Sequence, residues 1–211
     1  MTLIKSIYLA SKSPRRRMQL SQICDFLKLD LSILETNQNH CENLERQQKN
    51  EQADAYVKRV ARQKADLGRM TVKDLKLNPG LILAGDTIVK FKNCILQKPK
   101  DHLAAHQMIK NLSNNSHSVI TSIVLFNPYL KKKSLAKQFT QLTISSTVEF
   151  ANIPDSWIKK YVAADNPLDK CGGYSIQSDI IMFVKRIEGS YSSILGLPMA
   201  ETINLLEKVI N

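Results

Sequence analysis

The first residues whose types and spacing could do chemistry follow a short apolar segment at residues 4–9. Two hydroxyl groups, those of Ser11 and Ser13, precede a proline, and two guanidinium groups, those of Arg15 and Arg16, follow it. Proline suits the first position of a helix, so a helix is expected to begin directly after Ser13. Backbone amides at a helix N-terminus, hydroxyls and guanidinium forks together favour phosphate groups. The segment therefore predicts an anion-binding turn, although a capped helix with solvated basic residues has the same sequence.

A carboxylate follows a continuous apolar run in the first half of the chain. Residues 81–84 are all apolar, and Gly85, Asp86 and Thr87 come next. The run predicts a buried central strand with Asp86 at its carboxyl end, although the next two residues continue the extended pattern. Ligands of open α/β sheets bind at that end of the strands. Asp86 could deprotonate a water molecule or hold a metal ion that activates it, and the sequence leaves both roles open.

Two lysines could add positive charge near that carboxylate. Lys64 continues the apolar face of a helix expected over residues 52–67, which Gly68 should end. On this helix alone, a lysine with a buried stem and a solvated amine is the simpler interpretation. Lys98 precedes a proline, so its backbone is expected to be extended or in a turn. Neither lysine identifies a site by itself.

A glycine-containing segment late in the chain could approach a ligand closely. Residues 169–177 contain two adjacent glycines together with Asp169, Lys170 and Gln177. Glycine permits close backbone approach, and these three side chains supply charge and the hydrogen-bonding groups that read a base. Glycines in a tight turn are the alternative interpretation.

Helices and strands that alternate along the chain must position these residues. After the first strand and helix, an extended stretch at residues 29–34 leads into a polar stretch, residues 36–52, that is expected to be a long mobile loop. Residues 117–126 and 138–150 are β-rich and should pair as a hairpin. The other expected elements are helices after Asp101 and Pro154, a strand at residues 180–187 and a last helix at residues 199–209. This order indicates an α/β protein with a mixed sheet.

Composition limits the partners and the compartment. The chain has 211 residues, and its net charge of +11 favours anionic partners, whether nucleic acid, a membrane surface or phosphorylated small molecules. Aromatic residues do not interleave with the basic ones, which disfavours extended nucleic-acid binding. The four cysteines form no Cys-x-x-Cys pair, and we interpret them as reduced thiols of a cytoplasmic protein. The sequence has no signal-peptide pattern and no apolar run near the ~20 residues of a membrane span, so a soluble protein is expected.

Together these segments resemble the Maf family, in the expected order and over nearly the whole chain. The likeness rests on Ser-x-Ser-Pro-Arg-Arg, the helix lysine, Gly-Asp-Thr with a later Lys-Pro, Asp-Lys-x-Gly-Gly-Tyr-x-Ile-Gln, and Gly-Leu-Pro before the last helix. The resemblance implies a single domain over residues 1–211. Its fold would be two-lobed and α/β, with an elongated mixed sheet and a central cleft, similar to that of the inosine triphosphate pyrophosphatases. It also implies an acid anhydride hydrolase that cuts a nucleoside triphosphate between the α and β phosphates.

The resemblance assigns roles to individual residues. Asp86, Lys64 and Lys98 are expected to be catalytic. A second carboxylate should join them: Glu45 fits the family spacing, and Glu35 competes because the loop between them is longer than the family pattern. A divalent cation, Mg²⁺ or Mn²⁺, is implied as cofactor, with Glu45 and Asp86 as its ligands. Substrate binding is expected of Ser11, Ser13, Arg15, Arg16, Thr87, Asp169, Lys170 and Gln177.

Within the family, the chain is most similar to the branch that hydrolyses dTTP and UTP. Arg15, Thr87 and Gln177 carry that likeness, whereas the branch acting on 7-methyl-GTP usually has a tryptophan at the first of these places. The resemblance further implies a house-cleaning role on pyrimidine nucleotides, modified ones included, and a link to cell-division arrest. A nucleic-acid-binding or septum-regulating protein without turnover is the alternative class, and a homodimer is left open.

Overall fold

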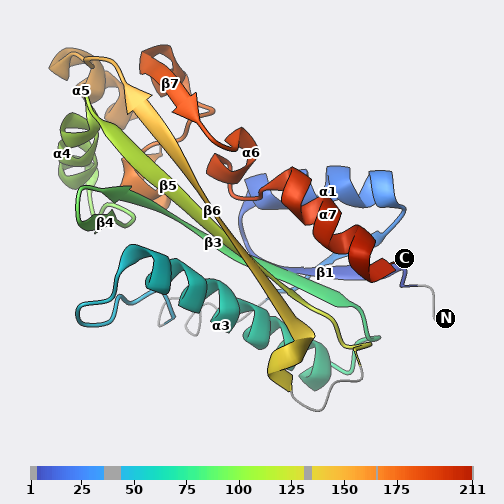
Figure 1. Cartoon of the computed structure of the whole chain (residues 1–211). Helices are drawn as coiled ribbons and strands as arrows, with labels where there is room; N and C mark the ends of the chain where they lie inside the picture. The colour runs from blue at the N-terminus through green and yellow to red at the C-terminus, as the bar shows by residue number, and fades with distance from the viewer. Residues whose placement is uncertain (1–3, 36–43, 131–134, 165, 211) are drawn as a thin grey trace. The chain divides into compact units, whose positions relative to one another are not determined.

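The computed structural model in Figure 1 describes residues 4–35, 44–130, 135–164 and 166–210. The chain divides into two compact units. The first unit is made of three segments, Met1–Asp86, Thr121–Ile144 and Leu195–Asn211. The second unit is made of two segments, Thr87–Ile120 and Ser145–Ile194.

The expected α/β class with a mixed sheet is confirmed. Strands follow the order β2-β1-β3-β5-β6-β7, with β4 paired to β3. β1 pairs in parallel with β2 and β3, whereas β4 is antiparallel to β3 and β7 is antiparallel to β6. β5 lies next to β6, as the predicted hairpin requires. The strands are β1 (Ser6–Ala10), β2 (Asp30–Ile33), β3 (Leu81–Phe91), β4 (Cys94–Leu96), β5 (Ser116–Phe126), β6 (Phe139–Phe150) and β7 (Val184–Glu188).

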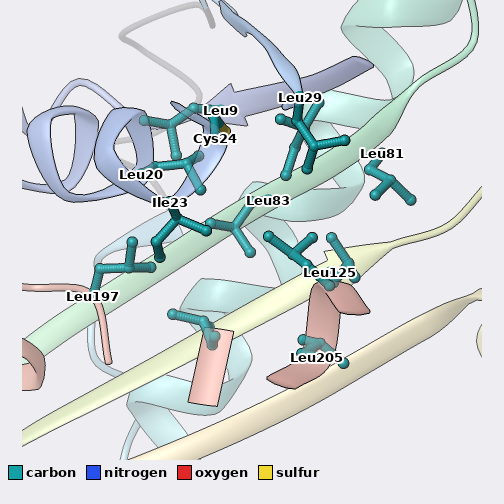
Figure 2. Packing of buried hydrophobic residues seen from close by; sticks show 13 residues of the cluster. Leu9, Leu20, Ile23, Cys24, Leu29, Leu81, Leu83, Leu125, Leu197 and Leu205 are labelled. Carbon is teal, nitrogen blue, oxygen red and sulfur yellow. The ribbon is translucent and has the colours of Figure 1, made fainter. Parts of the chain in front are cut away.

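Alternating residues of the strands in the first unit send apolar side chains to both faces of the sheet. On one face, Leu83 belongs to a buried cluster with Leu20 of α1 (Pro14–Leu27) and Leu205 of α7 (Met199–Ile210), drawn in Figure 2. On the other face, its neighbour Ala84 belongs to a cluster with Ala65 of α3 (Ala53–Asp74). Figure 1 shows α1 and α7 on one face of these strands and α3 on the other. Period-two burial of this kind follows from the pleat of a strand.

α3 is longer than the sequence predicts. A helix end is expected at Gly68, but α3 continues to Asp74. Gly68 faces the sheet, where an added Cβ would lie 2.7 Å from Ala10 Cβ and 3.0 Å from Ile82 Cγ2. The predicted helix end is therefore wrong, because this glycine serves the close approach of α3 to β1 and β3 and not the termination of the helix.

Short helices and turns make up much of the second unit. α4 (His102–Leu112) begins after its expected N-cap, since Asp101 Oδ1 accepts a hydrogen bond from Ala104 N at 2.7 Å. α4 packs against α5 (Asp155–Ala164), the helix expected after Pro154. The remaining short elements of this unit are η2 (Pro167–Asp169), η3 (Cys171–Gly173), η4 (Asp179–Phe183) and α6 (Tyr191–Ile194); η1 (Leu135–Gln138) belongs to the first unit.

The strand expected at residues 180–187 is wrong for its first half. η4 extends to Phe183, and β7 begins only at Val184. Ile180 is buried, whereas Ile181 and Met182 are exposed, so burial does not alternate as it would in a strand with one buried face. Ile181 N donates to Ser178 O at 3.0 Å, which closes a turn at this point.

The described residues test several other expectations only in part. No helix within the described ranges is both long and apolar enough to cross a membrane. Cys24, Cys94 and Cys171 form no disulfide among the described residues, and Cys41 lies outside them. Residues 36–43 of the expected mobile loop also lie outside the described part of the chain. The single domain with two lobes around a cleft stays a prediction.

Candidate active site

An ammonium group between two carboxylates forms the centre of the candidate site in the first unit. Lys64 Nζ donates to Glu45 Oε1 at 2.6 Å and to Asp86 Oδ1 at 2.8 Å. The side chains of Lys64, Glu45 and Asp86 are 15%, 31% and 12% exposed, so water has little access to the ion pairs. Of the two carboxylates that compete in the sequence, Glu45 meets the lysine, whereas Glu35 is exposed after β2.

Asp86 reaches this centre from the middle of β3, and its predicted place at the end of the strand is wrong. β3 continues to Phe91 because its second half pairs with β4. The parallel pairing of β1 with β3, however, stops at Ala10 and Ala84. Asp86 therefore lies just past the carboxyl end of β1, the edge at which ligands of parallel sheets bind.

Lys64 keeps its proton at this centre. Burial by itself lowers the pKa of the Lys64 ammonium, but the charges of Asp86 and Glu45 and their hydrogen bonds outweigh burial, so the pKa lies above its usual value. Within this group of three, two carboxylates share one ammonium, and the Arg59 guanidinium also interacts with Asp86. A neutral lysine is not favoured there.

The turn between β1 and α1 is held by its own hydroxyl groups. Ser13 is the N-cap of α1, and its Oγ accepts from Arg16 N at 3.3 Å. Ser11 Oγ accepts from Ser13 N at 3.2 Å and from Arg16 Nη1 at 2.7 Å. The helix start predicted after Ser13 is confirmed, since α1 begins at Pro14.

Arg16 is an internal side chain of the first unit. It is only 6% exposed, and its Nε donates to Gly196 O at 2.8 Å. Gly85 makes room for it, because an added Cβ there would lie 3.3 Å from Arg16 Nε. The guanidinium thus connects the start of α1 with the segment that precedes α7. Arg15, one residue earlier, is half-buried.

Predicted substrate residues of the second unit lie on segments that contact one another. Thr87 is half-buried in β3, and its carbonyl accepts from Cys171 Sγ at 3.4 Å. Gly172 N donates to Gln97 O at 3.3 Å, directly before Lys98, whose side chain is exposed. These bonds hold the segment that follows Lys170 against β3 and against the chain after β4.

Lys170 is engaged within its own turn. Its Nζ donates to Asp169 Oδ1 at 2.9 Å and to the carbonyl oxygen of Asn166. The side chain of Lys170 is 10% exposed, and that of Asp169 is 62% exposed. Gln177, at the far end of the segment, is exposed.

Buried side chains that the sequence does not assign to the site hold the segment around Gln177. The rings of His117 and Tyr174 are joined by a hydrogen bond of 2.6 Å between His117 Nε2 and Tyr174 Oη. Tyr161 Oη and Ser178 Oγ lie 2.9 Å apart. Through this contact His117 orders the segment around Tyr174. Its partner is 57 residues away, so no local pattern could identify the pair.

The carboxylates fit a divalent cation in part. Among the described residues, no group of three or more His, Cys, Asp or Glu side chains could hold a metal ion. Mg²⁺, however, is commonly bound by only one or two carboxylates together with waters and phosphate oxygens of the substrate. Glu45 and Asp86 are two such carboxylates, since both contact the same ammonium nitrogen. This donor set fits a divalent cation that keeps part of its water shell.

Comparison with known proteins identifies the family. The family described as "Maf-like protein" matches residues 6–209. The chain belongs to this family. Members of the Maf-like family with similar sequences include the dTTP/UTP pyrophosphatase of Escherichia coli strain K12, which is 37% identical over 202 residues, 95% of this chain and 91% of that protein. The dTTP/UTP pyrophosphatase of Albidiferax ferrireducens is 36% identical over 201 residues, 95% of each chain.

A solved structure gives a weaker likeness to this Maf-like chain. It is a nucleoside-triphosphatase / dITP/XTP pyrophosphatase from Mycobacterium abscessus, 14% identical, with a TM-score of 0.41 over 71% of this chain and 74% of that one. A likeness of this size does not establish a common fold.

Proposed function

We propose that the protein hydrolyses dTTP and UTP to the nucleoside monophosphate and pyrophosphate. Membership of the Maf-like family supports this activity. The similarity, along almost the whole chain, to relatives named dTTP/UTP pyrophosphatase supports it as well. The observation that carries the proposal is the contact of Lys64 with both Glu45 and Asp86 beside an N-capped serine turn. Paired carboxylates and a retained positive charge are what phosphoanhydride hydrolysis needs.

The reaction in this proposal is attack of water on the α-phosphorus. A bond forms between the water oxygen and the α-phosphorus, and the bond from that phosphorus to the α–β bridging oxygen breaks. Pyrophosphate leaves with the electron pair. Asp86 accepts the proton of the water, or orients the water when the carboxylate is a metal ligand. Lys64 holds both carboxylates in place and offsets the charge that develops on the phosphates.

A divalent cation belongs to the same proposal. Mg²⁺ or Mn²⁺ held by Glu45 and Asp86 would lower the pKa of a bound water and offset phosphate charge. The two carboxylates that share the ammonium of Lys64 support this assignment.

The remaining predicted residues bind the nucleotide in this proposal. Ser11, Ser13 and Arg15 contact phosphate oxygens at the N-terminus of α1, and Arg16 contributes by holding the turn. Residues of the second unit are also assigned to nucleotide binding, with base selection assigned to Thr87 and Gln177. The second-unit residues proposed to bind substrate are Thr87, Asp169, Lys170 and Gln177, with Lys98 as a catalytic cation.

Turnover of purified protein tests the proposal directly. With Mg²⁺ or Mn²⁺, dTTP and UTP should give pyrophosphate as the first product. The products are measured by ³¹P NMR. Asp86→Asn should lower kcat by at least about a hundredfold, the size of a lost general base, without changing the melting temperature by more than a few degrees. The control is Asp25→Asn, an exposed carboxylate on α1, which should keep wild-type kcat. Orthophosphate as the first product would contradict the proposal.

A panel of common and methylated triphosphates tests the base preference. The kcat/KM values for dTTP and UTP should be the highest. A higher kcat/KM for 7-methyl-GTP would place the protein in the other branch. Salt-dependent retention of DNA or RNA without turnover of any triphosphate would instead support the nucleic-acid-binding class.

A further inference from the structure

Glu45 lies on a segment that has little regular structure of its own. Residues 45–52 form turns and irregular backbone before α3 begins at Ala53. A carboxylate on such a segment reaches a defined place only if other elements fix the backbone. Among the described residues, side chains of α3 make such contacts.

Side chains of α3 bind three consecutive carbonyl groups around Glu45. Arg59 Nη1 donates to Leu44 O at 2.9 Å, and Arg59 Nη2 donates to Arg46 O at 3.0 Å. Tyr56 Oη donates to Glu45 O at 2.7 Å. The backbone on both sides of Glu45 and at Glu45 itself is therefore fixed to the same helix.

The guanidinium of Arg59 also binds the far end of this segment. Its Nε and Nη2 donate to the two carboxylate oxygens of Glu51 at 2.6 and 2.8 Å, and its Nη1 donates to Gln63 Oε1 at 3.0 Å. Together with the two carbonyl groups, these acceptors use all five N–H groups of an arginine. A lysine has three donors on one nitrogen and cannot reproduce this pattern.

The pair of Arg59 and Glu51 stays charged without adding net charge to the site. The side chain of Glu51 is 8% exposed, and its hydrogen bond with Arg59 keeps the pKa of its carboxyl below the usual value. The same hydrogen bond raises the pKa of Arg59. A bidentate pair of this kind fixes both side chains in one orientation.

The helix that fixes the backbone of Glu45 also carries the lysine that binds its carboxylate. Tyr56, Arg59 and Lys64 all belong to α3, and Lys64 Nζ contacts Glu45 Oε1 at 2.6 Å. The backbone and the side chain of Glu45 are therefore both held by α3. The position of α3 on the sheet also determines the contact of Lys64 with Asp86.

We propose that Arg59, together with Tyr56, is a positioning residue that places the Glu45 carboxylate at the Lys64–Asp86 centre for binding of the divalent cation. This rests on the proposed function, because it treats Glu45 as part of the reacting site. Arg59 acts through Glu45 and does not touch the substrate.

Substitution of the arginine by lysine tests this role. Arg59→Lys should lower kcat for dTTP about tenfold to a hundredfold, the usual cost of losing a group that orients a metal ligand, with KM changed less than about threefold. Mn²⁺ affinity, measured from the EPR signal of free Mn²⁺ without nucleotide, should fall by a similar factor. The matched control is Arg69→Lys on the same helix, whose guanidinium pairs with Asp66 at 2.8 Å, and it should leave both values within twofold.

A double-substitution cycle separates positioning from general stability. In a Glu45→Gln background, Arg59→Lys should change kcat and Mn²⁺ affinity by less than about twofold, because the carboxylate it positions is already gone. An equal loss in both backgrounds would overturn the proposal and leave Arg59 a merely stabilising residue. If Arg59→Lys does not fold, Tyr56→Phe carries the same test with an expected loss of about threefold to tenfold.

The outcomes distinguish this proposal from the proposed function. A wild-type protein that turns over dTTP while Arg59→Lys loses only thermal stability would contradict the positioning role alone. A wild-type protein that binds Mn²⁺ but hydrolyses no triphosphate would contradict the proposed function, and the Mn²⁺ affinities would still decide the role of Arg59. A wild-type protein with neither property would contradict both.

Discussion

His117 is buried as a neutral side chain in the second unit. It is 3% exposed, between the rings of Tyr174 and Phe150, and burial lowers its pKa from 6.5 to about 4. Nδ1 has no hydrogen-bond partner among the described residues, so protonation would create a charged donor in apolar surroundings. The neutral ring makes its hydrogen bond through Nε2, to Tyr174 Oη, and leaves Nδ1 without a partner among the described residues.

The titration of His117 predicts a loss of stability in mild acid. The unfolded chain takes up this proton below about pH 6.5, whereas the folded protein takes it up only near pH 4. The free energy of unfolding should therefore be retained above about pH 7 and fall by about 2 kcal/mol between about pH 7 and pH 5, with no further loss from this group below about pH 4. Urea unfolding of wild type and of His117→Phe at several pH values measures it. Identical pH profiles for the two proteins would contradict the assignment.

Local patterns place Lys64 on an apolar helix face and Asp86 after an apolar run, but only the resemblance to the Maf family assigns the two to one site. Local patterns also do not show which side chains are internal. Arg16 is an example: its acceptor, Gly196 O, is 180 residues away, and no local pattern distinguishes a buried guanidinium from a solvated one. Glu45 could not be separated from Glu35 because irregular backbone carries no period to count. In the structure, the hydrogen bonds of Arg59 fix the backbone of that segment in place.

α3 connects the core of the first unit with its chemistry. Lys64 lies one helical turn before Gly68, a residue at which α3 lies close to β1. The distance between helix and sheet therefore controls whether a lysine side chain can reach a carboxylate on β3. A side chain at position 68 would change both the distance between helix and sheet and the position of the Lys64 side chain.

Gly68→Ala should show this connection. Alanine favours a helix interior by about 1 kcal/mol, but its Cβ would lie 2.7 Å from Ala10 Cβ, and overpacking of that kind costs roughly 1–3 kcal/mol. We expect a net loss of stability of about 1 kcal/mol in chemical denaturation and a lower kcat. Ala10→Gly combined with Gly68→Ala removes the contact with the Ala10 methyl group and should restore kcat in part. A stabilised single variant with wild-type kcat would show that helix and sheet separate without disturbing Lys64.

Element types were predicted more reliably than element ends. The apolar periods of α4 and α7 identify these helices because each reports one buried face, and Pro14 marks the start of α1. β3 is identified by its continuous apolar run, which fits a strand buried on both faces. The end of α3 was missed because glycine has two uses, termination and close packing, and only the neighbouring strand distinguishes them. η4 was predicted as part of a strand because three consecutive apolar residues, Ile180, Ile181 and Met182, carry no signal of which of them is buried.

At the scale of the whole molecule, net charge should affect how fast a nucleotide arrives. The charge of +11 attracts a triphosphate at long range, and salt screens that attraction. We expect kcat/KM for dTTP to fall several-fold between about 20 and 200 mM NaCl at fixed Mg²⁺, while kcat changes little. Initial rates at each salt concentration measure this. A kcat/KM that does not depend on salt would show that the basic residues act only at short range.

The first unit is assembled from segments that leave the ribosome at very different times. Arg16, near the start of α1, is made 180 residues before Gly196, whose carbonyl group accepts its hydrogen bond, and α1 packs against α7. Until the last of the three segments emerges, the apolar face of α1 has no α7 to cover it, and the guanidinium lacks its acceptor. During synthesis the first unit therefore stays incomplete until the segment that begins at Leu195 emerges, because these long-range contacts can form only then.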